Sequence, residues 1–333
     1  MTFRTIDTHG HVAAPRAEAL VADEPGFQRQ RTADAAALGP PSLALNAKNA
    51  AAVGQELISV EARLTWMDSA GVDVQVVAPL PAQHPWADRS LAARFAEETT
   101  AAVVAHCAVA PDRLVGVGAV SLQHPDLAVD QLDEARGAGL RGVQISTTAR
   151  PGTELDSPVL EEFWAAAARL GLVVLLHPWG CSLSERLADY YLFNTVGNPT
   201  ETTLALSRLI FGRVLERHPG LRVWAPHGGG YLGAYLGRSD HAWHTRSDAR
   251  TTSAPPSVLF RRMWVDSLVH SGAQLRHLVE TVGADRVVLG SDYPFDMGVR
   301  DPVERLVAAG LSEDDVASIR GRNASSLFNL AGA

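Results

Sequence analysis

The stretch FRTIDTHGHVA at residues 3–13 has the pattern of a buried strand that ends in two histidines separated by one glycine. Residues i and i+2 of a strand point to the same face, so His9 and His11 are directed at one point beyond its end. Gly10 between them has no side chain and lets the backbone bend or approach another group closely. What occupies that point depends on the other strands that end beside it.

Short apolar runs rich in β-branched residues recur along the chain and predict eight strands. They lie at 3–7, 72–79, 114–120, 140–146, 172–178, 221–227, 262–267 and 286–292. Amphipathic helical stretches separate them, and several end in glycine just before the next strand, as a helix C-cap does. This alternation indicates parallel strands joined by right-handed crossovers. Eight such units predict one (β/α)8 barrel domain over residues 1–333.

A doubly wound open sheet is the alternative, disfavoured because no glycine-rich phosphate motif follows the first strand.

Two segments interrupt the barrel pattern. Residues 13–56 form a long insertion with little periodicity, which we expect to act as a lid or binding loop. Residues 228–261 form the second departure. The only lysine of the chain, Lys48, falls in the loop-like first insertion.

Composition limits the classes of partner. The 333 residues carry a net charge of −8, which argues against nucleic-acid or anionic-membrane binding. No apolar run reaches the length of a membrane span, and the first residues lack the pattern of a secretory leader. Cys107 and Cys181 make no disulfide framework, so we expect a cytoplasmic protein.

Three later strands also end in one ionisable residue. His177 ends the fifth candidate strand, His227 the sixth and Asp292 the eighth. The carboxyl ends of barrel strands converge on one face, where active sites form. Imidazole nitrogens and a carboxylate oxygen are a suitable ligand set for Zn²⁺. The five residues together therefore predict a metal site at the mouth of the barrel.

We assign the metal to His9, His11, His177 and Asp292, because a catalytic metal keeps an open position for water. His227 is then expected to take a proton from that water as a general base. The fourth candidate strand offers no lysine or carboxylate to bridge two ions, so one metal is favoured. His270 is a candidate to line the mouth. The remaining histidines are expected in loops or on helix surfaces without chemistry: His84, His106, His124, His218, His241, His244 and His277.

Four motifs resemble the signatures of the amidohydrolase superfamily: DTHGH at 7–11, LLHPWG at 175–180, HGGGYLGAYLGR at 227–238 and LGSDYPF at 289–295. They are most similar to its decarboxylase branch, typified by 2-amino-3-carboxymuconate-6-semialdehyde decarboxylase. WMDSAGVDVQVV at 66–77, WVDS at 264–267 and NASSLFNL at 323–330 extend the resemblance over nearly the whole chain. The resemblance implies a distorted (β/α)8 barrel, one zinc ion with Mn²⁺ as another candidate, and a homodimer.

The resemblance also implies roles for individual residues. The family's ligand pattern falls on His9, His11, His177 and Asp292, with His227 as the acid/base residue. Arg238 resembles an arginine that reaches a substrate carboxylate from the neighbouring subunit. The chain departs from the semialdehyde decarboxylases at AKNAAAVGQEL, residues 47–57, where a second carboxylate-binding arginine is missing. Trp179, Phe295 and Phe193 are candidates to face a flat unsaturated substrate or to pack the rim.

The predicted activity is metal-dependent, non-oxidative decarboxylation of an unsaturated or aromatic small-molecule carboxylic acid. His227 or Asp292 would move the proton that replaces CO2, and Arg238 would hold a carboxylate. The same residues would serve hydrolysis or hydration of a small carboxylated ester, lactone, amide or activated alkene. A metal-holding barrel kept as a binding or scaffold protein is the third interpretation. Carbon dioxide release separates the first from the others.

Overall fold

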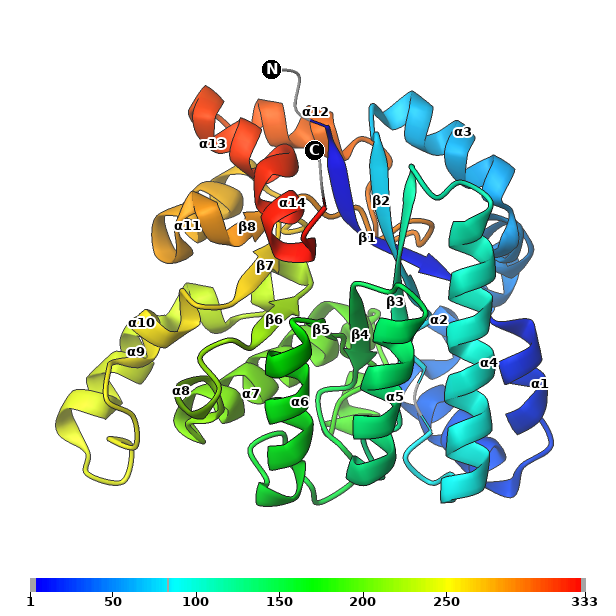
Figure 1. Cartoon of the computed structure of the whole chain (residues 1–333), viewed down its shortest axis with the longest axis horizontal. Coiled ribbons are helices and arrows are strands. Elements are labelled where there is room, and N and C mark those ends of the chain that lie inside the picture. The colour runs from blue at the N-terminus through cyan, green and yellow to red at the C-terminus, as the bar shows by residue number, and fades with distance from the viewer. Residues whose placement is uncertain (1–3, 83, 331–333) are drawn as a thin grey trace.

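The computed structural model describes residues 4–82 and 84–330, and its eight strands form one parallel sheet in consecutive order (Figure 1). The strands are β1 (Ile6–Val12), β2 (Val74–Pro79), β3 (Leu114–Ala119), β4 (Gly142–Ile145), β5 (Val173–Leu176), β6 (Arg222–Ala225), β7 (Trp264–Asp266) and β8 (Val287–Val288). Each overlaps one of the predicted strands. The first strand was predicted to end at residue 7, but β1 continues through both histidines to Val12.

The sheet closes between its first strand and the segment after β8. Asp7 bridges to Leu289 and Gly10 bridges to Tyr293, both in parallel orientation. The backbone N–H of His11 donates to the carbonyl of Tyr293, and that of Tyr293 donates to the carbonyl of His9. Eight parallel strands in this order with this closure make a (β/α)8 barrel, and the doubly wound alternative was wrong.

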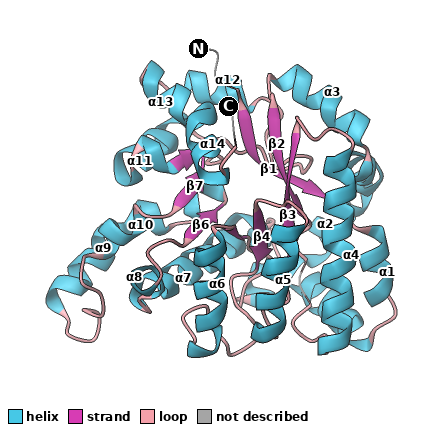
Figure 2. Cartoon of the chain, in the orientation of Figure 1, coloured by secondary structure: helices cyan, strands magenta, loops and turns pink. Residues whose placement is uncertain are grey.

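Helices surround the barrel (Figure 2). They are α1 (Pro15–Val21), α2 (Pro25–Ile58), α3 (Val60–Ala70), α4 (Arg89–Ala108), α5 (Pro125–Gly137), α6 (Glu161–Leu170), α7 (Asn198–Phe211), α8 (Val214–Arg217), α9 (Leu232–Thr245), α10 (Pro256–Phe260), α11 (Gly272–Val282), α12 (Pro302–Ala308), α13 (Glu313–Ala317) and α14 (Asn323–Phe328). Local signals set several ends: the Asp88 side chain accepts from the N–H of Leu91 before α4. Gly71 and Gly171 end α3 and α6 in the left-handed conformation.

Strand residues alternate between two cores. Val76, Val117, Leu175 and Trp224 belong to a cluster that fills the barrel and is covered at one end by α14. Their neighbours in sequence, such as Val77, Val174 and Val223, belong to the larger cluster between the sheet and the helices. The apolar side chains inside the barrel do not extend to its carboxyl end. Polar residues occupy that end, and the predicted site residues lie there.

The first insertion is helical over most of its length, so the expected loop-like segment was wrong in secondary structure. α1 and α2 cover residues 15–21 and 25–58, and α2 has a kink where Gly39 has a φ of 72° and two prolines follow. A Cβ at Gly39 would collide with the carbonyl oxygen of Ala188, so glycine allows α2 to pack against the chain after β5. Lys48 is exposed on α2.

The second departure from the barrel pattern also contains helices, namely α9 and α10. α9 and the loop after it extend away from the barrel (Figure 1). Within the part of the chain that the structure describes, no helix has the length and apolar character of a membrane span.

Candidate metal centre and adjoining cavity

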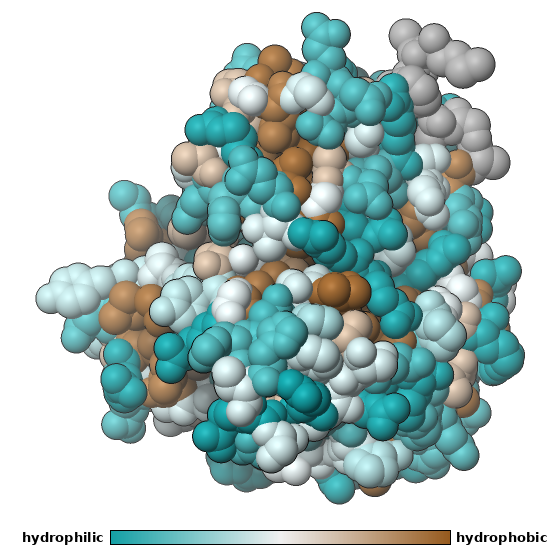
Figure 3. All heavy atoms as spheres, turned by 90° about the vertical axis from the view of Figure 1, so that its left-hand side faces the viewer, coloured by the Kyte–Doolittle hydropathy of each residue, from teal (hydrophilic) through white to brown (hydrophobic). Residues whose placement is uncertain are grey.

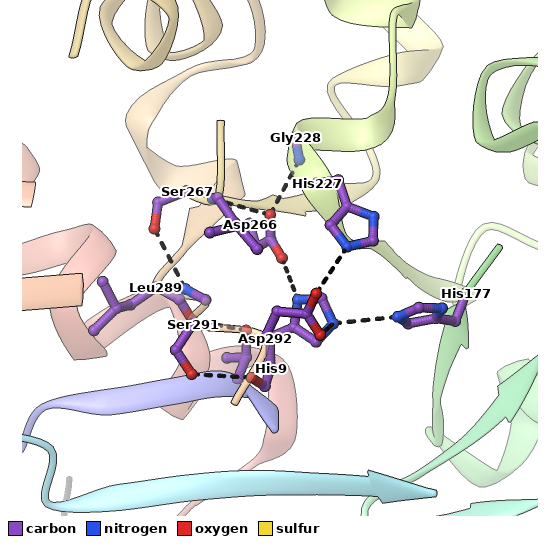
Figure 4. Close-up of polar contacts among 12 residues, drawn as sticks. His9, His177, His227, Gly228, Asp266, Ser267, Leu289, Ser291 and Asp292 are labelled. Carbon is purple, nitrogen blue, oxygen red and sulfur yellow. Dashed lines mark hydrogen bonds and ion pairs between the residues drawn. The ribbon is translucent and has the colours of Figure 1, made fainter. Parts of the chain in front are cut away.

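Four segments far apart in sequence bring the predicted ligands together at the carboxyl end of the barrel. One ligand atom from each of His9, His177, His227 and Asp292 lies within 4.8 Å of the others, as a metal-binding group requires. His11 joins them, since its Nε2 lies 3.2 Å from Nε2 of His9 and 3.2 Å from Oδ1 of Asp292. Figure 4 shows the carboxylate of Asp292 between the rings of His9, His177 and His227.

Barrel closure explains why Asp292 meets the two histidines of β1. The bridge between Gly10 and Tyr293 sets the register, so the residue before Tyr293 lies beside both His9 and His11. Asp292 has a φ of 59° there, a left-handed conformation that is uncommon outside glycine. His227 also has a positive φ, 55°, and it is followed by three glycines in that region. Both side chains are turned inward by backbone that ordinary strands do not adopt.

Hydrogen bonds on the far side of each ring determine which nitrogen faces the centre. Nδ1 of His11 lies 2.9 Å from the carbonyl of Pro79, and Nδ1 of His177 lies 2.9 Å from the carbonyl of Pro178. A carbonyl oxygen only accepts, so each Nδ1 carries the hydrogen and each neutral ring presents a lone pair at Nε2. Nδ1 of His9 donates to Asp266 in the same way. Three Nε2 lone pairs therefore point at one another.

The three Nε2 atoms are spaced as the ligands of one cation are. Nε2 of His9 lies 3.3 Å from Nε2 of His177 and 3.2 Å from Nε2 of His11. Two nitrogens bound at ordinary Zn–N lengths in a tetrahedral site are about 3.3 Å apart. Oδ1 of Asp292 is also buried without a hydrogen-bond donor among the described residues. A divalent cation satisfies all four groups, so the donor set fits a metal.

Burial and charge set the protonation of the cluster. Burial lowers the pKa of His11 and His177, which keeps both rings in the neutral form that binds metals. Burial would also lower the pKa of His9, but the charge of Asp292 and the hydrogen bond to Asp266 raise it to about 9. Without a metal, His9 therefore holds a second proton at Nε2, and a bound cation would displace that proton and use the lone pair. Burial would raise the pKa of Asp292, yet the neighbouring histidines hold it well below its usual value. The site therefore retains a carboxylate that attracts positive charge.

Asp266 of β7 is a site residue that the strand-end pattern did not identify. It is fully buried, and its Oδ2 accepts from His9 at 2.8 Å. Its Oδ1 accepts from the backbone N–H groups of Gly228 and Leu268, at 3.0 and 3.1 Å. A carboxylate behind a ligating imidazole orients the ring and raises its basicity. The sequence did contain a signal for this residue, because Asp266 is the aspartate of WVDS and lies at the end of a predicted strand.

Arg63 of α3 supports the site from behind and was also missed. It is fully buried and donates to the carbonyl of His11, to Gln75 and, at 2.9 Å, to Nε2 of His106. Its guanidinium carbon lies 5.0 Å from the ring centroid of Tyr293. It thus contacts both segments of the barrel closure, β1 and the residues after β8, that carry predicted ligands.

Asp7 continues this network beneath β1. Its carboxylate accepts from the side chains of Gln75 and Ser291, at 2.7 and 2.6 Å, and from the backbone N–H of His9. Ser291 immediately precedes Asp292. Burial raises the pKa of Asp7. The buried polar groups thereby connect the two segments that carry predicted ligands, β1 and the residues after β8.

A cavity of about 310 Å³ opens beside His227 and Asp292. Neutral polar side chains on its wall include Asn194, Asn198 and Gln274, and His270 borders it as expected. His227 is the least buried of the five converging residues, with 21% of its side chain exposed, and its Nε2 lies 3.6 Å from Oδ2 of Asp292. A molecule in the cavity would therefore meet His227 first.

The predicted substrate contacts lie at three separate places. The ring of Phe295 lies 5.3 Å from that of His11. Trp179 is half exposed, packs on the buried Phe193 and donates to Asp34 of α2. Arg238 is exposed on α9. These three residues are absent from the described lining of the cavity beside His227.

The remaining histidines were expected in loops or on helix surfaces, and this was wrong for His106, which lies at a buried position of α4; His84 and His218 lie in loops as expected. His84, His106 and His218 are buried. His106 accepts from Arg63, and His218 pairs with Glu161 at 3.0 Å. His277 is exposed but lines the cavity beside His227.

A family model described as Amidohydrolase matches residues 6–330 of the chain. The chain belongs to the amidohydrolase family. It is 32% identical over 275 residues to 2-amino-3-carboxymuconate-6-semialdehyde decarboxylase of Dictyostelium discoideum, covering 81% of the chain and 76% of that relative. It is 29% identical over 297 residues to gamma-resorcylate decarboxylase of Rhodococcus jostii, covering 81% of the chain and 87% of that relative.

Solved amidohydrolase structures share the fold over the whole chain. The crystal structure of 5-carboxyvanillate decarboxylase from Sphingomonas paucimobilis is 25% identical with a TM-score of 0.83, covering 98% of this chain and 99% of that one. A dihydroxybenzoic acid decarboxylase from Polaromonas sp. JS666, solved with manganese and 2-nitroresorcinol, is 22% identical. Its TM-score is 0.83, covering 100% of this chain and 98% of that one.

Proposed function

We propose that this amidohydrolase is a metal-dependent, non-oxidative decarboxylase of an aromatic or unsaturated carboxylic acid. The convergence of three imidazole lone pairs and the Asp292 carboxylate beside a cavity of about 310 Å³ carries this proposal. That volume suits a molecule with one aromatic ring. The decarboxylases among its relatives, which are named for aromatic or unsaturated acids, support the reaction class.

The metal is assigned to His9, His11, His177 and Asp292. Zn²⁺ suits this mixture of nitrogen and oxygen ligands, and Mn²⁺ is the other candidate. When bound, the ion supplies charge stabilisation for the substrate's oxygen atoms or lowers the pKa of a bound water. The protein's own contribution is to hold the three rings in the tautomer that leaves Nε2 free, through Asp266 and the carbonyls of Pro79 and Pro178.

Proton transfer is assigned to His227 and Asp292. Decarboxylation breaks the bond between the ring or vinyl carbon and CO2, and a proton takes the place of CO2 on that carbon. His227 borders the cavity and lies 3.6 Å from the Asp292 carboxylate, so one side chain contacts both substrate space and the ligand group. A histidine in this position donates or accepts a proton near neutral pH.

The carboxylate of the substrate needs a cationic partner besides the metal. Among the described residues that line the cavity beside His227, none is lysine or arginine. This supports a homodimer in which Arg238, exposed on α9, reaches the site of the neighbouring subunit. The face that carries α9 and α11 is mainly hydrophilic with scattered hydrophobic groups (Figure 3).

For the domain organisation, we propose one barrel domain over residues 1–333, in which residues 13–56 are a lid-like insertion. α2 supports this role because Asp34 accepts from Trp179 after β5, so the insertion contacts the rim of the barrel mouth. Both cysteines are free thiols, as in the reducing cytoplasm where we place the protein.

The test begins with metal analysis of the purified protein by mass spectrometry. The loaded enzyme is then incubated with 2,6-dihydroxybenzoate, 5-carboxyvanillate and unsaturated dicarboxylates, while CO2 and product mass are measured. Release of one CO2 per molecule of decarboxylated product supports the decarboxylase. Addition of water without CO2 indicates a hydrolase or hydratase. Bound metal with every acid unchanged indicates a binding protein and contradicts the proposal.

A further inference from the structure

A second and larger cavity lies between α1, the start of α2 and α4. Its volume is about 520 Å³, and the carboxyl ends of β2 and β3, the residues that follow them and Gln144 of β4 form its inner wall. α1 lies against α4 at this place (Figure 1). Among the described residues that line the cavity, none is one of the five converging ligand residues. The volume falls in the range of small-molecule sites.

The wall of this cavity is largely apolar and carries no positive charge. Its apolar lining includes Ala17 and Val21 of α1, Phe27 of α2, and Phe95 and Ala96 of α4. Among the described lining residues, arginine and lysine are absent and Glu18 is the acidic one. A carboxylate placed here would lose its hydration without gaining a cation. The wall therefore selects against anions.

His84 supplies a hydrogen-bond acceptor to this apolar space. Its Nδ1 lies 3.1 Å from Oε1 of Gln30, which also accepts from Nε1 of Trp86 at 2.7 Å. Because an amide oxygen only accepts, Nδ1 of His84 carries the hydrogen. Burial lowers the pKa of His84 to about 4, so the ring is neutral at pH 7. Its Nε2 is then a lone pair, and no described residue is its hydrogen-bond partner.

Aromatic rings hold His84 in place. The centroid of its ring lies 4.7 Å from that of Phe95 and 5.5 Å from that of Phe27, both in edge arrangements. Farther along the wall, Thr99 Oγ1 and Gln144 Oε1 are buried without hydrogen-bond partners among the described residues. Unsatisfied polar groups of this kind are costly. A ligand with hydroxyl groups would offset part of that cost.

We propose that this cavity is a second ligand site, which binds an uncharged phenol or aromatic alcohol. The ring would lie against Phe27 and Phe95, and the hydroxyl would donate to Nε2 of His84. Binding there requires neither a metal nor turnover. The site is nevertheless connected to the metal centre, because Pro79 lines the cavity and its carbonyl accepts from His11.

The experiment measures binding of 2-naphthol and 2-naphthoate by calorimetry, with the metal-loaded enzyme and again after chelation. 2-Naphthol is expected to bind in both states. After chelation it should bind at least tenfold more tightly than 2-naphthoate, which in the loaded enzyme would also bind at the metal centre. Ala96→Leu fills the cavity and should weaken 2-naphthol binding at least tenfold. Ala105→Leu is the matched control, since Ala105 is exposed on the same helix.

A second variant keeps the test decisive if Ala96→Leu fails to fold. His84→Phe retains a ring between Phe27 and Phe95 but removes the acceptor, so the affinity should fall about threefold to tenfold. Circular dichroism and melting temperature verify that each variant is folded. Equal affinity for naphthol and naphthoate after chelation, or naphthol binding that is lost on chelation or unchanged in both variants, would overturn the proposal.

Discussion

Nδ1 of His9 donates to Oδ2 of Asp266 at 2.8 Å, and both side chains are fully buried. The other oxygen of the same carboxylate accepts from the backbone N–H of Gly228, the residue after His227. One side chain of β7 therefore orients a proposed metal ligand and fixes the loop of the proposed acid/base residue. This explains how strands one, six and seven are kept in register at the mouth of the barrel.

Asp266→Asn should weaken metal binding about 10- to 100-fold, because the amide holds the His9 ring less firmly in the required tautomer. The measurement is the dissociation constant for Zn²⁺ and Mn²⁺ by competition with a chelator. Asp285→Asn is the control, since 70% of the Asp285 side chain is exposed in its pair with Arg286. Unchanged affinity in Asp266→Asn would remove Asp266 from the support of the site.

His177→Ala should lower the metal content of the purified protein, because one of three converging Nε2 lone pairs is lost. Metal per chain is measured by mass spectrometry after dialysis against a fixed free-metal concentration. His241→Ala, at an exposed position of α9, should retain the wild-type content. Full metal occupancy in His177→Ala would exclude that ring as a ligand.

His227→Ala should keep the metal but lower kcat about 10²- to 10⁴-fold, the usual contribution of a positioned acid or base. Metal content and CO2 release are measured on the same preparation. Loss of the metal together with activity would instead make His227 a ligand. Wild-type turnover with the metal retained would refute its role in proton transfer.

Arg63→Met should lower the free energy of unfolding by about 3 kcal/mol, because three buried acceptors lose a charged donor. Arg300→Met is a matched control: Arg300 stacks on the same Tyr293 ring, at 5.2 Å, but 53% of its side chain is exposed. Its removal should cost less than about 1 kcal/mol. Urea unfolding followed by circular dichroism gives both values, and equal effects would contradict the special role of Arg63.

Arg238→Ala and His177→Ala should each be nearly inactive, but mixed dimers of the two variants should recover activity. One site of such a dimer combines an intact metal centre with the other chain's Arg238. Random mixing of equal amounts therefore restores about one quarter of the wild-type rate if the dimer is symmetric. The rate is measured after co-refolding. No recovery, with dimers present by size-exclusion chromatography, would mean that Arg238 does not act across the interface.

Much of the site was predictable because the end of each barrel strand is visible in the sequence, as an apolar run that stops at a polar residue. An apolar strand that stops at His177 or Asp292 places an ionisable group at the mouth whatever the details of packing. The helical state of residues 15–58 was missed because hydrophobic periodicity is weak there. Its alanine-rich composition was the available signal, since alanine is the strongest helix former.

The sequence by itself determined the order of strands and helices, the positions of the strand-end histidines and aspartate, and the family. Those features depend on local periodicity and on residue type. Only the tertiary structure decided that Asp266 and Arg63 support the site, that His84 lies in an apolar cavity, and which ring nitrogens face the centre. These depend on contacts between residues far apart in the chain, such as Pro79 with His11, which no local pattern records.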